Sequence, residues 1–262
     1  MSENKMKKIT GGSFTGERAL FFERNAHISE SVFFDGESPL KESENIILER
    51  TKFEWKYPLW YSKNIEARDC FLSETARSGI WYTHNISFTD SEIRAPKTFR
   101  RSSGITLKNV KMPNALETMW GCSDIVLDDV YICGDYFCMN CENIKAKNLV
   151  IDGNYAFDGA KNIEIRDSKL NTKDSFWNCE NVTVYDSVIL GEYMGWNSKN
   201  VTLINCTVES NQGMCYMDNV VLRDCKLVNT DLCFEYCTVD AEINSHVDSV
   251  KNPISGRIVA DS

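Results

Sequence analysis

The chain carries a short hydrophobic pattern that recurs from one end to the other. Segments such as ESENIILERTKF, YSKNIEARDCFL and GAKNIEIRDSKL share an Asn, an apolar residue one position later and a second apolar residue three positions later. An acidic or amide residue usually follows at the fifth position. We call the first position of each copy the anchor. The anchors recur at steps of 19 to 21 residues and are Asn25, Asn45, Asn64, Asn85, Gly104, Asp124, Asn143, Asn162, Asn181, Asn200 and Asn219.

Three apolar columns run through this repeat. The positions one, three and eight residues after the anchor are apolar in every copy, as in Ile46, Leu48 and Phe53 of the second copy. At 42% hydrophobic composition, one such column would arise by chance with a probability on the order of 10⁻⁴. Alternation with a period of two predicts strands and excludes arrays of helical repeats.

The repeat length selects the architecture. A unit of about 19 residues has room for three short strands with tight corners, and each strand can pair in parallel with its counterpart in the next unit. The sequence therefore predicts an all-β chain folded as a single-stranded right-handed parallel β-helix of about 11 coils with three short sheets. We expect one domain over residues 1–262, with an N-terminal cap or partial coil at 1–14, regular coils at 15–230, and an irregular C-terminal coil and tail at 231–262.

The polar columns and most cysteines are explained by folding. An Asn at a corner tolerates left-handed backbone, and its amide can bond the Asn of the next coil. Cysteines recur six residues after the anchor and two residues before it, among small residues, which indicates tightly packed interior positions. These cysteines are Cys70, Cys206, Cys225, Cys122, Cys141 and Cys179.

One column resists that explanation. Five of the six tryptophans lie four residues before an anchor, and the column one residue earlier is apolar. If the earlier column points inward, the Trp column points outward, where exposed aromatic residues beside charges are typical of a binding surface. Contact with a partner or the C-terminal tail, and an inward orientation in a wider coil, are the alternatives.

Bulk composition narrows the classes of function. The net charge of −9 argues against binding to a nucleic-acid backbone. We find no signal peptide and no apolar run approaching the ~18 residues of a membrane span, so we expect a cytoplasmic protein. Of the eleven cysteines, only Cys138 and Cys141 form a CxxC motif, and three histidines complete no zinc pattern, so we expect neither metal nor cofactor.

The anchored coils resemble right-handed β-helix proteins such as pectate lyases and polygalacturonases. The segments GGSFTGERALFFERN, FEWKYPLWYSKNIEARDC, IRAPKTFRRSSG and SVKNPISGRIVADS resemble more closely a bacterial family of unknown function with this fold. This resemblance covers nearly the whole chain and implies a fold, not an activity. Asn229-Thr230-Asp231 matches one polygalacturonase motif without the other three. The segment from Arg94 to Arg101 misses the Arg-x-Pro-x-x-Arg spacing of pectate lyases by one position.

The sequence thus leaves two hypotheses open. The first is a carbohydrate-binding or carbohydrate-active protein that binds a glycan or acidic sugar along the Trp column. If it is an enzyme, we expect a polysaccharide lyase or a glycoside hydrolase. Its predicted catalytic residues are Glu117, Asp158 and Arg100. Its predicted substrate-binding residues are Trp60, Tyr61, Arg77, Trp81, Tyr82, Lys97, Arg101, Trp120 and Trp177. The second hypothesis is a non-catalytic scaffold or interaction module, with a homo-oligomer formed through the Trp column or the coil ends.

Overall fold

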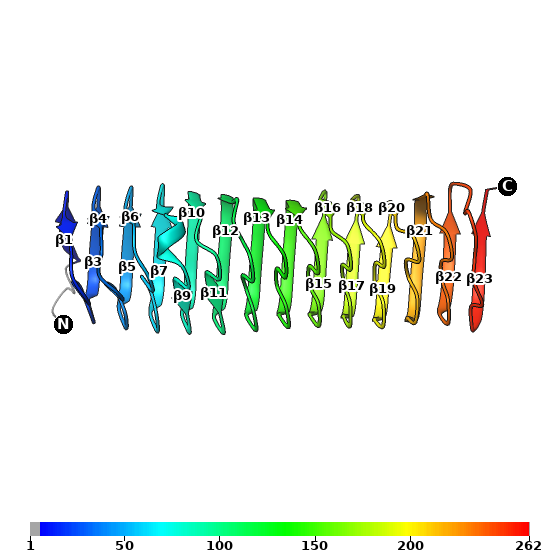
Figure 1. Ribbon diagram of the computed structural model, residues 1–262, viewed down its shortest axis with the longest axis horizontal. Helices are drawn as coiled ribbons and strands as arrows, with labels where there is room; N and C mark the ends of the chain where they lie inside the picture. Colours follow the sequence, from blue (N-terminus) through cyan, green and yellow to red (C-terminus); the bar gives the residue numbers. More distant parts are fainter. Residues whose placement is uncertain (1–5, 262) are drawn as a thin grey trace. The chain divides into compact units, whose positions relative to one another are not determined.

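The structure, a computed structural model, describes residues 6–261 and divides into two compact units, one ending at Cys133 and one beginning at Gly134. The outermost residues of the predicted cap and tail, 1–5 and 262, lie outside the described residues. Each unit consists of parallel strands stacked coil upon coil (Figure 1). The predicted fold class, a right-handed parallel β-helix, is confirmed.

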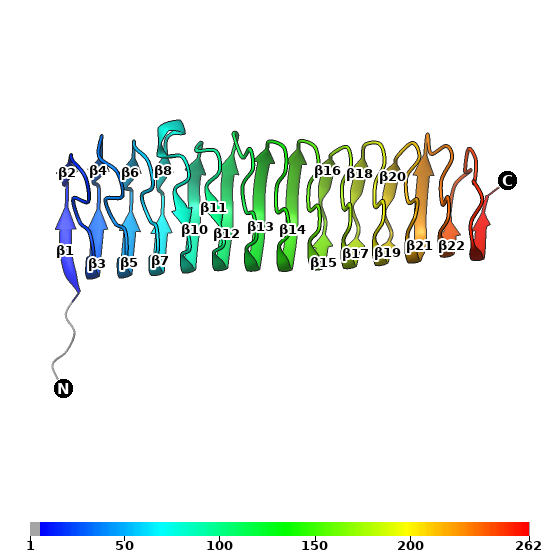
Figure 2. The same cartoon turned by 60° about the horizontal axis from the view of Figure 1, so that its bottom comes forward.

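The first unit contains short strands and several longer ones that run through a corner. Its strands are β1 (Lys7–Thr10), β2 (Ser13–Phe14), β3 (Arg24–Ser29), β4 (Val32–Phe33), β5 (Glu44–Glu49), β6 (Lys52–Phe53), β7 (Lys63–Arg68), β8 (Phe71–Leu72), β9 (Ile80–Trp81), β10 (His84–Ile93), β11 (Phe99–Arg100), β12 (Ser103–Met112) and β13 (Ser123–Cys133). A one-turn 3-10 helix, Glu74–Ala76, follows β8 and projects beyond the neighbouring corners (Figure 2).

The second unit repeats the same plan. Its strands are β14 (Glu142–Asp152), β15 (Lys161–Arg166), β16 (Lys169–Asn171), β17 (Glu180–Tyr185), β18 (Val188–Leu190), β19 (Lys199–Ile204), β20 (Thr207–Glu209), β21 (Asp218–Val228), β22 (Thr238–Ile243) and β23 (Ser255–Ala260).

The apolar columns of the sequence are the core of each unit. Across β5 and β7, Ile46 pairs with Ile65, and Leu48 pairs with Ala67. All four side chains are at most 3% exposed. Because parallel pairing in register places like residues above one another, each coil buries its apolar side chains against the same columns of its neighbours.

The anchors lie where the backbone turns through the left-handed region. Asn45 has φ of 57° and Asn64 has φ of 56°, a conformation that Asn tolerates better than most residues with a β-carbon. The side chain of Asn64 donates from Nδ2 to Oδ1 of Asn45 at 2.9 Å and accepts from Asn85 at 3.1 Å. The anchors of the second unit form a similar side-chain ladder, which holds successive corners in register. Its bonds run from Asn162 to Asn143, Asn181 to Asn162, Asn200 to Asn181 and Asn219 to Asn200.

The C-terminal segment is more regular than the sequence indicates. The two units contain about 13 coils where the repeat predicts about 11. One reason is that Val239 of β22 pairs with Val220 of β21, and β23 then pairs with β22. The sequence pattern fades because Thr238 replaces the anchor Asn and the next step is shorter than 19 residues. Residues beyond Leu227 thus add coils to the second unit, with a register shift between Leu222 and Cys225 where β21 pairs with β22.

The cysteines of both repeating columns are buried. Cys70, Cys122 and Cys206 are each 2% exposed, and all eleven cysteines are free thiols. Burial raises the pKa of the Cys70 thiol to about 11. These side chains therefore fill interior layers as small apolar groups.

Candidate functional site

The Trp column lies outside the core. Its apolar neighbours Leu59 and Ile80 are fully buried, whereas Trp60, Trp81 and Trp120 are half-buried. Alternation along each short strand accounts for this difference, because successive side chains point to opposite faces. The tryptophans of the first unit therefore line its surface.

The rings of this column cover one another's faces. Trp60 and Trp81 stack with centroids 5.2 Å apart and planes 9° apart. The Arg100 guanidinium carbon lies 5.0 Å from the Trp81 ring centroid and 4.4 Å from that of Trp120. We call Trp60, Trp81, Arg100 and Trp120 the inner ladder. Because each flat face meets the next coil, the inner ladder presents mainly ring edges outward.

The indole N–H groups are used to fix corners. Trp81 Nε1 donates to the main-chain oxygen of Lys97 at 2.9 Å, one coil further on. Trp60 donates in the same way to the main-chain oxygen of Ser78. In the second unit, Trp177 donates to Tyr193 at 2.8 Å. The Trp column thus has a structural role in both units.

A second row of side chains flanks the inner ladder. Tyr61 and Tyr82 stack with centroids 4.8 Å apart and planes 6° apart. Arg101 continues this row, with its guanidinium carbon 5.9 Å from the Tyr82 ring centroid. Tyr61 is 49% exposed, and we call Tyr61, Tyr82 and Arg101 the outer ladder.

Cations outnumber carboxylates beside these ladders. Glu117 Oε2 lies 3.0 Å from Lys97 Nζ and 2.8 Å from Arg100 Nη2. Arg77 and Arg101 are exposed, and neither forms an ion pair with a carboxylate among residues 6–261. The Nε atom of Arg100 is buried without a hydrogen-bond partner. The structure therefore brings seven of the nine predicted binding residues together with Glu117 and Arg100 on the first unit. Arg77 belongs to the same unit and follows the 3-10 helix.

Asp158 and Trp177 belong to the second unit. Asp158 Oδ1 accepts a hydrogen bond from Asn178 Nδ2 at 2.9 Å, and Asn178 in turn accepts from Asn197 at 2.8 Å. Trp177 stacks on Trp196 with centroids 5.9 Å apart. Asp158 is thus part of a corner ladder similar to that of the anchors.

A buried carboxylate accompanies the second unit's aromatic residues. Asp174 is 2% exposed, and this burial raises its pKa above the usual value although the neighbouring Lys173 opposes the shift. The Tyr155 hydroxyl is hydrogen-bonded to the Asp174 carboxylate. The Tyr155 ring stacks on that of Tyr136, with centroids 4.7 Å apart. Ionisation of Asp174 in the folded protein therefore carries a desolvation cost that the hydrogen bond from Tyr155 only partly offsets.

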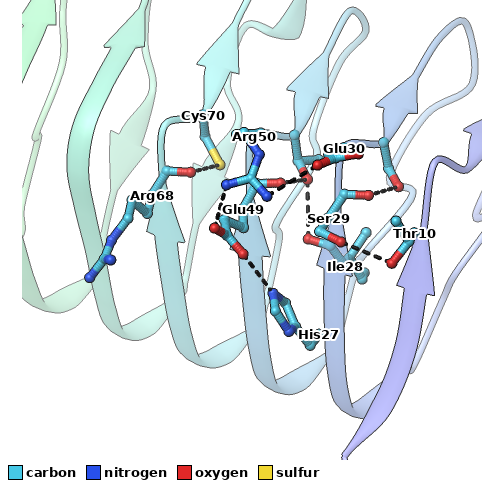
Figure 3. Close-up of polar contacts among 11 residues, drawn as sticks. Thr10, His27, Ile28, Ser29, Glu30, Glu49, Arg50, Arg68 and Cys70 are labelled. Carbon is cyan, nitrogen blue, oxygen red and sulfur yellow. Dashed lines mark hydrogen bonds and ion pairs between the residues drawn. The ribbon is translucent and has the colours of Figure 1, made fainter.

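The sequence did not indicate a depression on the outer face of the first unit's long sheet. It spans β3, β5, β7 and β10, and its lining side chains include His27, Glu49, Glu66 and Arg68. Figure 3 shows Arg50 and His27 on opposite sides of the Glu49 carboxylate, with Arg68 pointing away from it. A comparison of charged outward positions in successive coils could have found this cluster.

Within the described part of the chain, no group of three or more His, Cys, Asp or Glu side chains is arranged to hold a metal ion. No helix between residues 6 and 261 is long and apolar enough to cross a membrane.

Comparisons with known proteins agree with the fold. Residues 7–262 match the family described as "Protein of unknown function (DUF3737)". No curated protein matches the sequence. The A-module of the mannuronan C-5 epimerase AlgE4 from Azotobacter vinelandii is a similar solved structure, with a TM-score of 0.51 and 10% identity over 94% of this chain and 90% of that one. PfbA, a surface adhesin of Streptococcus pneumoniae, is a second similar structure, with a TM-score of 0.54 and 9% identity over 92% of this chain and 85% of that one. At these identities the likeness concerns the fold alone.

Proposed function

The chain belongs to the DUF3737 family of proteins of unknown function, and we propose that it is a non-catalytic binding protein for an acidic polysaccharide. The ligand lies along the inner and outer ladders of the first unit. The observation that carries this proposal is the excess of cations there: Lys97 and Arg100 share the carboxylate of Glu117, and Arg101 in the outer ladder has no carboxylate partner among residues 6–261.

Local charge contrasts with the charge of the whole chain. The protein carries a net charge of −9, so a repeated anion would be repelled from most of its surface. The exposed guanidinium group of Arg101, in the outer ladder, and that of Arg77, at the end of the 3-10 helix, have no carboxylate partner among the described residues. Guanidinium groups bind carboxylates through paired hydrogen bonds, which suits a uronate-type glycan.

The stacking geometry selects the manner of recognition. Sugars that pack on aromatic side chains need a free ring face. In the inner ladder those faces are covered by the neighbouring coils, as between Trp60 and Trp81. The rings therefore act as a rigid support that positions Arg100, and ionic hydrogen bonds supply the recognition.

Binding is favoured over catalysis because the three predicted catalytic side chains are already engaged. Glu117 accepts hydrogen bonds or ion pairs from Lys97 and Arg100, and Asp158 accepts from Asn178. A general acid or base must be able to reach a substrate proton, and these contacts compete with that role.

The structural neighbours are compatible with this proposal without establishing it. One is named a mannuronan epimerase module and the other a surface adhesin. A stack of parallel coils offers a long row of equally spaced side chains, and such a row suits a repeating polymer.

Binding to immobilised polysaccharides tests the proposal. We expect saturable binding to polygalacturonate at low salt that weakens with added NaCl, and no comparable binding to fully methyl-esterified pectin. The double variant Arg77→Gln/Arg101→Gln should bind roughly tenfold more weakly, since each exposed ionic contact contributes about 0.2–1 kcal/mol. Lys108→Gln, an exposed position on β12 outside the ladders, is the matched control.

Two results would overturn the proposal. One is an absence of binding to any acidic polysaccharide at low salt. The other is binding that the double variant leaves equal to that of Lys108→Gln. A defined protein that binds the wild type and not the double variant would instead favour the interaction-module hypothesis.

A further inference from the structure

The outer face of the sheet β3–β5–β7–β10 carries a second concave site, independent of the ladders. The geometry points to a binding site for a single sugar-acid unit, a small molecule that carries one carboxylate and several hydroxyl groups. The side chains that define it are His27, Glu49, Glu66, Arg68, Ser87 and Thr89. This inference does not rest on the proposed polysaccharide binding.

Parallel register places these side chains in two adjacent rows. Glu49, Arg68 and Thr89 are aligned across β5, β7 and β10, and Glu66 and Ser87 are aligned two residues earlier. Long side chains stand on one side of the rows, and the short Ser87 and Thr89 stand on the other. A hollow between them is the consequence of this difference in length.

One wall of the hollow is fixed by hydrogen bonds and ion pairs. Glu49 Oε2 lies 3.1 Å from His27 Nε2, and Arg50 pairs with both Glu49 and Glu30. The hydrogen bond from Arg50, followed by that from His27, lowers the pKa of Glu49. This wall is therefore an ordered network in which each carboxylate already has a hydrogen-bond partner.

The floor and opposite wall carry unmatched charges. Neither Arg68 nor Glu66 forms an ion pair within residues 6–261, although both are exposed. The strand under Arg68 is held from inside, because Cys70 Sγ donates to the main-chain oxygen of Arg68 at 3.3 Å. Figure 3 shows the Arg68 side chain extending away from Glu49.

These groups match the chemistry of a sugar acid. The Arg68 guanidinium would donate paired hydrogen bonds to a carboxylate. Glu66 would accept hydrogen bonds from ring hydroxyls, and the hydroxyl groups of Ser87 and Thr89 can donate or accept. A simple dicarboxylate lacks the hydroxyls, and a neutral sugar lacks the carboxylate, so each would satisfy only part of the site.

The volume limits the size of the ligand. The depression measures about 260 Å³, the space of roughly nine water molecules at about 30 Å³ each. Drug-sized ligands occupy pockets of about 300–1,000 Å³. The depression therefore has room for one sugar unit.

Titration of the full-length protein with three small probes tests the inference. Galacturonate should bind saturably in the millimolar range or tighter, and galactose and glutarate should each bind at least fivefold more weakly. Arg68→Gln should weaken galacturonate binding at least tenfold, as expected for the loss of a charge-assisted pair. Lys108→Gln, in the same outward column as Arg68 but outside the lining, should leave it unchanged.

The folding of each variant is checked by its circular dichroism spectrum and melting temperature. Should Arg68→Gln fail to fold, Glu66→Gln gives a second test, with a loss of at least threefold expected. Galacturonate binding unchanged in a folded Arg68→Gln or Glu66→Gln protein, or no saturable binding to the wild type, would overturn the inference. The ladder variant Arg77→Gln/Arg101→Gln should retain galacturonate binding, so failure here is distinguishable from failure of the proposed function.

Discussion

Trp81 Nε1 donates a hydrogen bond to the main-chain oxygen of Lys97, which lies in the following coil. The bond ties a half-buried row of side chains to the backbone of the next corner. It also gives tryptophan a role here that phenylalanine could not fill, because the indole carries an N–H donor.

Trp81→Phe should therefore lower the free energy of unfolding by about 1 kcal/mol through loss of that hydrogen bond. Trp81→Ala should cost more, since stacking on Trp60 and the contact with Arg100 are lost as well. Chemical denaturation measures both. Trp55→Phe is the control, because Trp55 lies outside the column, and its change should stay within about 0.5 kcal/mol. Equal losses for Trp55→Phe and Trp81→Phe would contradict the role of the bond.

The anchor ladder gives a prediction that separates hydrogen bonding from backbone strain. Asn64→Ala removes two ladder bonds and leaves at φ of 56° a residue that tolerates the left-handed region less well than Asn, so we expect a loss of about 2–4 kcal/mol. Asn64→Gly removes the same bonds without the steric cost and should lose about 1 kcal/mol less. Asn114→Ala, outside the ladder, should change stability by less than about 0.5 kcal/mol. Thermal unfolding of the three variants decides whether this order holds.

Glu117 distinguishes binding from catalysis at the ladders. Glu117→Gln removes the one carboxylate beside Lys97 and Arg100, so the site becomes more cationic and polygalacturonate should bind a few-fold more tightly. Glu74→Gln, on the exposed 3-10 helix, controls for the general change in charge. Weaker binding by Glu117→Gln, or a loss of polymer cleavage, would show instead that this carboxylate acts on the ligand.

Asp174 predicts how stability depends on pH. Burial raises its pKa in the folded state, so the folded protein binds this proton more readily than the unfolded chain does. The contribution of Asp174 to stability therefore rises as the pH falls through that pKa and is unfavourable at neutral pH. Asp174→Asn should melt at a higher temperature than the wild type at pH 7, and the difference should shrink at pH values below the normal range of Asp, about 4. Asp167→Asn, at an exposed corner, should not show this pattern; a constant difference across pH would contradict the explanation.

Thiol labelling tests the interior assignment of the cysteines. Burial raises the pKa of Cys70 to about 11 and the pKa values of Cys233 and Cys237 to about 12. At pH 8 roughly one Cys70 thiol in a thousand would be ionised, and the side chain is also shielded from reagent. Iodoacetamide followed by mass spectrometry should modify the half-buried Cys133 first and Cys70 only after denaturation. Rapid native labelling of Cys70 would disprove its placement in the core.

The sequence predicted the coils because each coil repeats the same physical requirements. Ile46, Ile65 and Ile86 occupy one buried column, and Asn45, Asn64 and Asn85 occupy one left-handed corner, so both columns were visible without coordinates. Thr238 departs from the anchor type, and for this reason the last coils were missed. The outward position of the Trp column followed from alternation, but its ring orientation did not, since stacking of Trp60 on Trp81 depends on side-chain torsions. The pair His27 and Glu49 was missed because its members stand in different columns of different coils.

The anchor bonds of the second unit reach only from one coil to the next, as from Asn162 to Asn143 and from Asn181 to Asn162. If residues 162–180 were deleted as a block, Asn181 would follow Asn143 with the same spacing and could form the same bond. Loss of an odd number of residues within a strand would shift the interior positions that follow it to the surface. Within a unit, length can therefore change by duplication or deletion of entire coils, while the chain is intolerant of smaller insertions in its strands.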